Sequence, residues 1–361
     1  MTDNNQDIVS VDSGKGKGAE GKCKSRAGRW VITAVCLVVM GWGIWQFTSM
    51  ASRYDGEQGV WIKIPKGASK EAVNDSLRNN LGEEYGRKVA SYWGGNPERS
   101  RGAYLVEPGE KAIDIARRLD NGRQTPVKLT FNNVRTLEQL DQRLTARMDW
   151  RPGEFSDTFA VVADGMGLSE ALLLGRMMPD TYEVYWTATP RKAIEKILRN
   201  YDNFWNAERR AKAEALGLTP DQVGIIASIA EEETAKSDER GKVARLYMNR
   251  LKRGMKLQAD PTVKYAVGDF SIKRVGGKML DTDSPYNTYR YAGLPPGPVR
   301  IPDRRTLDAV LDAPGHDYIY MCAKADFSGY HDFTSDYAEH QRNAAAFRRA
   351  LDARGITLPG N

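Results

Sequence analysis

Residues 225–234 read Ile-Ile-Ala-Ser-Ile-Ala-Glu-Glu-Glu-Thr, an apolar run that ends in three consecutive glutamates. At the 100° per residue of an α-helix, Ile226 and Ile229 lie on one face, and Glu233 falls on that same face. The two glutamates before it point to either side. The pattern therefore predicts that the Glu233 side chain is carried toward the packed interior of the protein.

A carboxyl group in that position has the protonation behaviour of a general acid. Burial disfavours its charged form and raises its pKa from about 4.3, so that the acid stays protonated near neutral pH. The alternative interpretation is a solvated helix end, at which all three glutamates face water. These ten residues alone do not distinguish a buried general acid from a solvated helix end.

The start of this helix is marked by a capping box. Thr219 is the expected N-cap, Pro220 suits the first helical position, and Gln222 completes the box. These residues fix the phase of the helix and place Glu233 about three and a half turns along it.

The composition of the chain excludes one large class of protein. Its 361 residues are enough for two domains. Its net charge of +6 comes from both signs spread through the sequence, not from the dense basic stripe of a nucleic-acid binder. No nucleic-acid partner is therefore expected. The cysteines, Cys23, Cys36 and Cys322, include no CxxC pair.

The N-terminal part of the chain predicts a membrane anchor. Residues 1–29 are polar and basic, and we expect a disordered cytoplasmic tail there. Residues 30–50 carry no charge, and as a helix they would span roughly 31 Å, about one hydrocarbon core. The basic flank places the N-terminus in the cytoplasm and the rest outside; a cleaved signal peptide is the alternative. Residues 51–59 form a tether, and this topology separates the cysteines, so no disulfide is expected.

A strand, a turn and a helix follow one another three times between residues 60 and 150. The expected strands are residues 60–64, 104–106 and 127–131, and the expected helices are residues 70–81, 111–119 and 136–144. The second unit, with its Pro-Gly turn, resembles the LysM module that binds peptidoglycan. We therefore expect LysM-like α+β units over residues 60–150; a structural spacer without a ligand is the alternative.

Residues 151–361 predict a helix-rich second domain. A hairpin of residues 318–322 and 331–333 supplies a short sheet, and residues 340–351 form the final helix. Prolines and aromatic residues gather in the loops of this half, where functional sites are often carried. The predicted fold class is therefore α+β, with a transmembrane helix, small LysM-like units and a mixed domain.

Five short motifs follow one another in this half: residues 227–234 (ASIAEEET), 249–251 (NRL), 257–262 (LQADPT), 286–289 (YNTY) and 293–297 (GLPPG). Their order and spacing resemble the YceG-like family, whose members are endolytic murein transglycosylases. The resemblance extends from about residue 60 to the C-terminus and is strongest over residues 220–342. One departure is Met177-Met178, where family members usually carry aromatic residues.

The resemblance implies a reaction. Family members cut the bond between N-acetylmuramic acid and N-acetylglucosamine inside peptidoglycan strands, without water as the nucleophile. The muramyl C6 hydroxyl attacks the anomeric carbon and leaves a 1,6-anhydro end, so the second carboxylate of hydrolytic glycosidases is not required. One glutamate serves as acid and then as base. It directly precedes the threonine and maps onto Glu233, which the helix phase also selects; Glu231 is the alternative.

The other motif residues are expected to bind the sugar hydroxyl and acetamido groups. This is what the resemblance suggests, and a hydrogen bond that fixes a loop is the alternative for each. His331 is expected to line the cleft, and Asp260-Pro261 could equally begin a helix. No metal is expected, because the histidines lack the spacing of zinc ligands. The expected substrate-binding residues are Asn249, Gln258, Asp260, Tyr286, Asn287, Thr288 and His331.

The sequence thus predicts a single-pass inner-membrane lyase with its catalytic domain in the periplasm. The expected partners are peptidoglycan glycan strands, peptidoglycan synthases and the membrane, with no cofactor. Two alternatives stay open. One is a catalytically silent glycan-binding scaffold of the cell-wall machinery, and the other is a muramidase that hydrolyses the same bond with water.

Overall fold

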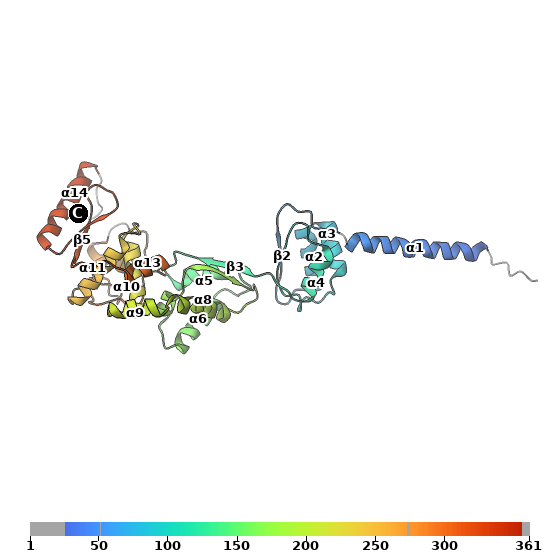
Figure 1. The fold of residues 1–361 in the computed structure, drawn as a ribbon, viewed down its shortest axis with the longest axis horizontal. Coiled ribbons are helices and arrows are strands. Elements are labelled where there is room, and N and C mark those ends of the chain that lie inside the picture. Colours follow the sequence, from blue (N-terminus) through green and yellow to red (C-terminus); the bar gives the residue numbers. More distant parts are fainter. Residues whose placement is uncertain (1–25, 51, 273–274, 356–361) are drawn as a thin grey trace, which may run out of the picture.

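The structure is a computed structural model that describes residues 26–50, 52–272 and 275–355. Nearly all of the expected tail, residues 1–25, lies outside the described residues. A long helix, α1 (Arg26–Met50), leads into an elongated row of units with three separate hydrophobic cores (Figure 1).

The first unit is built on a two-stranded antiparallel sheet in which Val60 pairs with Val106 and Ile64 with Gly102. Along the first strand Ile62 and Ile64 are buried, whereas Trp61 is exposed, so one face of the sheet supplies the core. The helices pack their apolar stripes on that core. The elements are β1 (Val60–Ile64), α2 (Lys70–Leu81), α3 (Glu83–Tyr92), β2 (Gly102–Val106) and α4 (Ala112–Asp120).

The three expected repeats do not form three equivalent units. β1 and β2 share one sheet, whereas the third expected strand pairs with residues 180–184, for which no strand is expected from the sequence. In that pairing Leu129 lies opposite Tyr182, and both side chains are buried. Because this partner is about fifty residues away, local pattern alone does not reveal it. The expected boundary at residue 150 therefore falls between two strands of one sheet.

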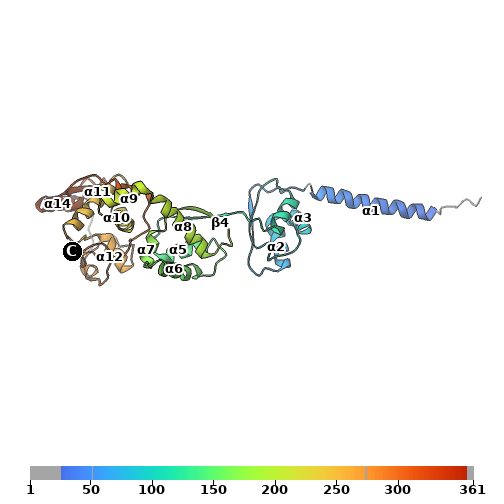
Figure 2. The same cartoon turned by 60° about the horizontal axis from the view of Figure 1, so that its bottom comes forward.

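Helices surround this second sheet. Figures 1 and 2 show α5, α6 and α8 beside it, and its core contains Phe131, Phe155, Phe159 and Ile194. The elements are β3 (Val127–Phe131), α5 (Leu137–Thr145), α6 (Glu154–Gly165), α7 (Glu170–Gly175), β4 (Asp180–Val184) and α8 (Pro190–Phe204).

The third unit is organised around α10, the helix that ends in the three glutamates. Every residue from Val223 to Ala230 is buried, because α10 packs against α7, α9, α11, α12 and α13. The helices are α9 (Ala207–Ala215), α10 (Pro220–Glu233), α11 (Arg240–Lys252), α12 (Asp260–Val267), the 3₁₀ helix η1 (Gly277–Asp281), α13 (Arg304–Leu311) and α14 (Tyr337–Ala353).

The expected hairpin is confirmed as an antiparallel pair, β5 (Tyr320–Ala323) and β6 (His331–Thr334), in which Cys322 lies opposite Asp332. The final helix, α14, begins three residues earlier than expected, because the Asp336 side chain caps it. Together these units confirm a mixed α+β fold with many helices and small sheets.

Helix α1 occupies the stretch that the sequence predicts to cross a membrane. Its large apolar side chains are exposed, from Trp30 to Trp45. Within the part of the chain that the structure describes, no helix combines the length and the apolar character that a membrane-spanning segment needs.

Candidate active site

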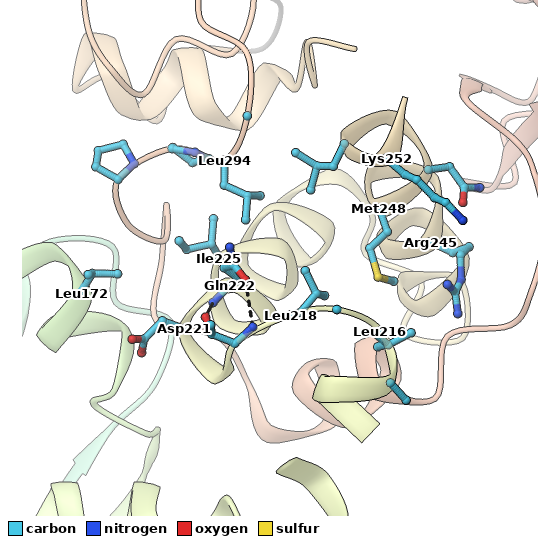
Figure 3. A pocket seen from close by; sticks show the side chains of 18 residues that line it. Leu172, Leu216, Leu218, Asp221, Gln222, Ile225, Arg245, Met248, Lys252 and Leu294 are labelled. Carbon is cyan, nitrogen blue, oxygen red and sulfur yellow. Dashed lines mark hydrogen bonds between the residues drawn. The ribbon is translucent and has the colours of Figure 1, made fainter. Parts of the chain in front are cut away.

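The helix that carries Glu233 begins with the expected capping box. The Gln222 backbone N–H donates to Thr219 Oγ1 at 3.2 Å, and the Thr219 N–H donates to Gln222 Oε1 at 2.9 Å. Pro220 is the first helical residue, and Figure 3 shows this end of α10. The phase inferred from the sequence is therefore the phase of the helix.

Arginines hold the two glutamates that precede Glu233. Arg300 lies 3.1 Å from the Glu231 carboxylate and 3.0 Å from that of Glu232. Arg135 binds Glu232 through two hydrogen bonds of 3.0 Å, and the Asp303 N–H donates to Glu231 Oε2 at 2.9 Å. Both carboxylates are thus engaged in ion pairs at the helix end, and neither lines the cavity that Glu233 faces.

Glu233 is half-buried: protein surrounds its carboxyl group, yet the side chain lines a cavity. Tyr247, on α11, donates its phenol hydrogen to Glu233 Oε1 at 2.5 Å. Burial raises the pKa of Glu233 to about 7; the Tyr247 hydrogen bond opposes this rise, and the nearby Asp260 charge adds to it. Near neutral pH the group can therefore both give and accept a proton.

The Tyr247 phenol is a neutral donor. The residue is almost fully buried, and burial raises its pKa well above the ordinary value of a tyrosine. The hydrogen bond occupies one oxygen of Glu233, which leaves the other oxygen for chemistry in the cavity.

The cavity has a volume of about 380 Å³, within the range of small-molecule sites. It brings together four of the predicted site residues, and Tyr247, Arg250 and Tyr289 add polar groups beside them. No group of three or more His, Cys, Asp or Glu side chains is placed to hold a metal ion among the described residues. The predicted residues in the lining are Glu233, Gln258, Asp260 and His331.

Gln258 is held in a conformation that is unusual for its type. Its φ of +51° is left-handed, which costs a non-glycine residue roughly 1–2 kcal/mol. Arg250 donates to Gln258 Oε1 at 2.6 Å, and the Gln258 N–H donates to the Thr288 carbonyl at 3.2 Å. Such strain, maintained by surrounding contacts, clusters at functional sites.

Asp260 supplies a second carboxylate to the cavity. The Tyr289 hydroxyl donates to Asp260 Oδ1 at 2.7 Å. Helix α12 begins at Asp260 with Pro261 behind it, so the expected helix start is present, but Ala259 and not Asp260 occupies the N-cap position.

His331 is joined to the end of α10 through Glu239. The His331 Nδ1 lies 2.7 Å from Glu239 Oε2, and the His331 N–H donates to Glu239 Oε1 at 2.8 Å. The Thr234 hydroxyl also donates to Glu239 Oε2, at 3.0 Å. The threonine that follows Glu233 thus takes part in fixing β6 against the helix end.

With this geometry in place, comparison with known proteins decides the family. The family model described as the YceG-like family matches residues 62–346, most of the chain.

The chain belongs to the YceG-like family.

Two relatives are both named endolytic murein transglycosylase. The protein of Bacillus subtilis (strain 168) is 28% identical over 309 residues, which cover 80% of this chain and 84% of that protein. The protein of Streptococcus pneumoniae (strain D39) is 26% identical over 320 residues, which cover 79% of this chain and only 58% of that protein. The crystal structure of a putative YceG-like protein from Listeria monocytogenes has the same fold, with a TM-score of 0.53 at 24% identity, over 80% of this chain and 99% of that one.

Two YceG-like motif residues, Asn249 and Tyr286, do not line the cavity of Glu233. The Asn249 amide donates to the carbonyls of His316 and Tyr318 at 2.8 and 3.0 Å, which fixes the approach to β5. Tyr286 packs its ring against Tyr265 with centroids 4.4 Å apart.

Asn287 and Thr288 are buried beneath the site rather than in its lining. The Asn287 amide donates to the carbonyls of Leu280 and Thr282 at 2.9 and 2.8 Å. Thr288 Oγ1 accepts from the Ala259 N–H at 3.1 Å. The Thr288 hydrogen bond fixes the loop that presents Gln258 and Asp260, whereas those of Asn287 fix the segment of Leu280 and Thr282. The expected role of both residues in substrate binding stays a prediction.

The methionines that depart from the YceG-like pattern are core residues. Met177 is buried in the core of the second unit, and Met178 is buried in the core of the third. Neither side chain lines the cavity of Glu233.

The sequence predicts no site role for Tyr247, Arg250 or Tyr289. Tyr247 and Arg250 lie three residues apart on α11, a spacing that puts both on one helical face. That spacing, on the helix after the glutamates, could have singled them out. Nothing local in the sequence marks the pairing of Tyr289 with Asp260.

A larger cavity of about 940 Å³ lies at the N-terminal half of α10 (Figure 3). Glu233 is not among its lining residues. Apolar side chains such as Ile225, Met248 and Leu294 line it. The carboxylate in its lining, Asp221, is paired with Arg176 at 2.7 Å. The larger cavity therefore has its carboxylate held in an ion pair, whereas the smaller cavity contains Glu233. We place the candidate site in the smaller cavity.

Proposed function

We propose that this chain is an endolytic peptidoglycan lytic transglycosylase in which Glu233 is the acid and then the base. The observation that carries the proposal is a carboxyl group with a pKa of about 7, hydrogen-bonded to Tyr247 and lining a cavity. A carboxyl group of this kind suits general acid–base work at neutral pH. Membership of the YceG-like family and the names of its relatives support the substrate class.

The proposed reaction uses the Glu233 carboxyl group twice, first as a proton donor and then as a proton acceptor. Protonated Glu233 gives its proton to the glycosidic oxygen as the bond from that oxygen to the muramyl C1 breaks. The C6 hydroxyl of the same muramyl residue forms the new bond to C1, and its proton passes to the Glu233 carboxylate. Glu233 ends protonated, no water is consumed, and the product carries a 1,6-anhydro end.

Three cavity residues are proposed to hold the substrate. Gln258, Asp260 and His331 present amide, carboxylate and imidazole groups beside Glu233, where hydroxyl and acetamido groups of the sugars can pair with them. The remaining motif residues are proposed to act through the loops that they fix. The assignment of the first unit as a LysM-like glycan binder and the contact with peptidoglycan synthases stay predictions.

Replacing Glu233 tests the proposed role directly. In the full-length chain acting on purified glycan strands, Glu233→Gln should lower the yield of anhydro-ended products by roughly 10²–10⁴-fold, because neither proton transfer remains. Mass spectrometry of the products is the measurement. Glu214→Gln, the same change on the exposed face of α9, is the matched control. Retention of anhydro ends by Glu233→Gln would overturn the assignment.

Hydrolysis is the second candidate, because Asp260 places another carboxylate in the same cavity and could activate water. The same mass spectra separate the two reactions, since a hydrolytic product is heavier than the anhydro product by one water. Products that carry that water throughout would favour the muramidase.

We further propose that residues 30–50 anchor the enzyme in the inner membrane, with the three units in the periplasm. The stretch carries no charged residue, and its large apolar side chains are exposed, from 73% at Trp30 to 52% at Trp45. Exposure of so much contiguous apolar surface is unfavourable in water and is relieved by a covering partner or lipid. Cell fractionation tests this: the full chain should sediment with membranes and be released by detergent, and recovery in the soluble fraction would contradict it.

A further inference from the structure

The cavity of Glu233 has an aromatic part that the proposed reaction does not use. Tyr320 on β5 and Tyr337 and His340 on α14 line it together. The Tyr320 and His340 rings are stacked, with centroids 5.2 Å apart and planes at 19°. The Tyr337 centroid lies 5.5 Å from that of Tyr320 and 6.3 Å from that of His340. These three rings, the aromatic wall, face the same space as the catalytic carboxyl group.

Tyr337 is the ring of this wall that remains open to solvent, with 57% of the residue exposed. Its position is nevertheless fixed. It is the first residue of α14, which is capped by the Asp336 carboxylate accepting from the Glu339 N–H at 2.6 Å. The Glu339 side chain in turn accepts from the Thr334 hydroxyl at 2.6 Å. An exposed ring that is already positioned loses little conformational entropy when a ligand covers it.

The charges around the aromatic wall favour a neutral ligand. Burial and the nearby Arg250 charge lower the pKa of His340, so its ring is uncharged near neutral pH. The Arg250 guanidinium donates to the carbonyls of Lys256 and Ile319 and to Gln258, so each of its three nitrogens already has a partner within the protein. A phosphate or carboxylate ligand would therefore have to compete with these hydrogen bonds for the Arg250 guanidinium.

A hydroxylated ring with one apolar C–H face meets these conditions. Aromatic faces suit apolar contact, and the polar groups of Gln258 and Asp260 lie in the same cavity to pair with hydroxyl groups. A volume of about 380 Å³ sits at the lower end of the range for small-molecule sites, which suits a short segment of glycan.

We propose that the aromatic wall is a saccharide subsite, in which the open face of Tyr337 stacks on an N-acetylhexosamine ring next to the bond that Glu233 cleaves. The identity of the sugar rests on the proposed function. Tyr320 and His340 pack their rings against that of Tyr337, tilted to it by 54° and 36°, and form the rest of the wall.

Binding without turnover tests the subsite. In the full-length Glu233→Gln chain, the affinity for a β-1,4-linked N-acetylglucosamine tetramer is measured by isothermal titration calorimetry. Tyr337→Ala should weaken binding roughly threefold to tenfold, the effect of losing one aromatic contact. Tyr337→Phe, which keeps the ring, should bind like its parent. Tyr185→Ala is the matched control, because Tyr185 is 55% exposed on a loop outside the cavity.

Several outcomes would overturn the subsite. They are a parent chain that does not bind the tetramer, a Tyr337→Ala chain that binds as tightly as its parent, and equal losses in Tyr337→Phe and Tyr337→Ala. Thermal melting of each variant shows that the comparison is made between folded proteins. Failure of the proposed function looks different, since a chain with no anhydro-ended products can still bind the tetramer through Tyr337.

Discussion

Two opposing influences act on the Glu233 carboxyl group: its burial and its hydrogen bond with Tyr247. Burial favours the neutral acid, whereas the phenol donor favours the carboxylate, and the resulting pKa is about 7. The phenol itself does not titrate in this range, because burial raises the pKa of Tyr247 well above its ordinary value. Glu233 is therefore the partner whose charge changes near neutral pH.

Removing the hydrogen bond between Tyr247 and Glu233 should change how activity depends on pH. Tyr247→Phe removes the donor that stabilises the carboxylate, so the pKa of Glu233 rises and the protonated acid persists to higher pH. The alkaline limb of kcat/KM should move to higher pH, while the maximal rate falls roughly tenfold because the carboxyl group loses one orienting hydrogen bond. The measurement is the pH profile of cleavage.

A matched control for this profile is Tyr104→Phe, which removes another buried tyrosine hydroxyl, bonded to the Ser100 carbonyl in the first unit. Its profile should coincide with that of the unmodified chain. An alkaline limb that stays in place, or moves to lower pH, in Tyr247→Phe would contradict the role given to Tyr247.

At the residue scale the sequence predicted Glu233 but not the contacts of the other motif residues. The helical period put Glu233 on the face of Ile226 and Ile229. In the structure α10 is buried on every side from Val223 to Ala230, and the Glu231 side chain is only 6% exposed, so burial alone does not separate the glutamates. The hydrogen bonds of Asn287 and Thr288 depend instead on how their loop folds back onto Leu280 and Ala259. Residue type alone does not distinguish a sugar contact from a loop contact.

At the scale of the element, the C-terminal end of α10 carries three negative groups where the helix dipole already disfavours negative charge. Arg300 contacts Glu231 and Glu232 together, and its side chain is largely buried. These two ion pairs hold the carboxylates of Glu231 and Glu232 away from the cavity. Glu233, the last residue of α10, is the glutamate that lines it.

Removing Arg300 should destabilise the protein. Arg300→Met leaves Glu231 with Arg240 at 4.0 Å as its remaining ion pair, so the free energy of unfolding should fall by about 3 kcal/mol. Urea denaturation measures this. Arg304→Met is the comparison, because Arg304 pairs with Asp180 in a solvent-exposed setting and should cost less than about 1 kcal/mol. Equal losses of unfolding free energy in the two variants would contradict a stabilising role for the buried ion pairs of Arg300.

At the scale of the whole molecule, the sequence located most helices and strands but not their pairing. The runs at residues 60–64 and 127–131 look alike locally, yet β1 pairs with β2 and β3 pairs with β4. Strands pair when their side chains pack into the same core. Leu129 and Tyr182 lie opposite each other and share a core built from segments that are distant in the sequence. The apparent threefold repeat is therefore a property of the local pattern and not of the fold.

The proposed anchor has a consequence at the same scale. Of the α1 side chains that the structure describes, those of residues 30–45, none belongs to any of the three cores, so we expect the remaining chain to keep its cores without that helix. A chain of residues 51–361 should leave the membrane fraction and still cleave isolated glycan strands in solution. Membrane association of that shorter chain would show that surfaces other than residues 30–50 bind the membrane.

The adjacent methionines at the junction of the second and third units determine how those units can move. Met177 is embedded in one core and Met178 in the next, so the backbone between them is not a free linker. Ile301, in the segment that leads into α13, is also buried in the core of the second unit, and its N–H donates to the Val134 carbonyl at 2.8 Å. A rotation at this junction would extract a methionine from its core. The second and third units should therefore diffuse as one rigid body, and any conformational change that admits a glycan strand must arise in the loops and the hairpin around the cavity.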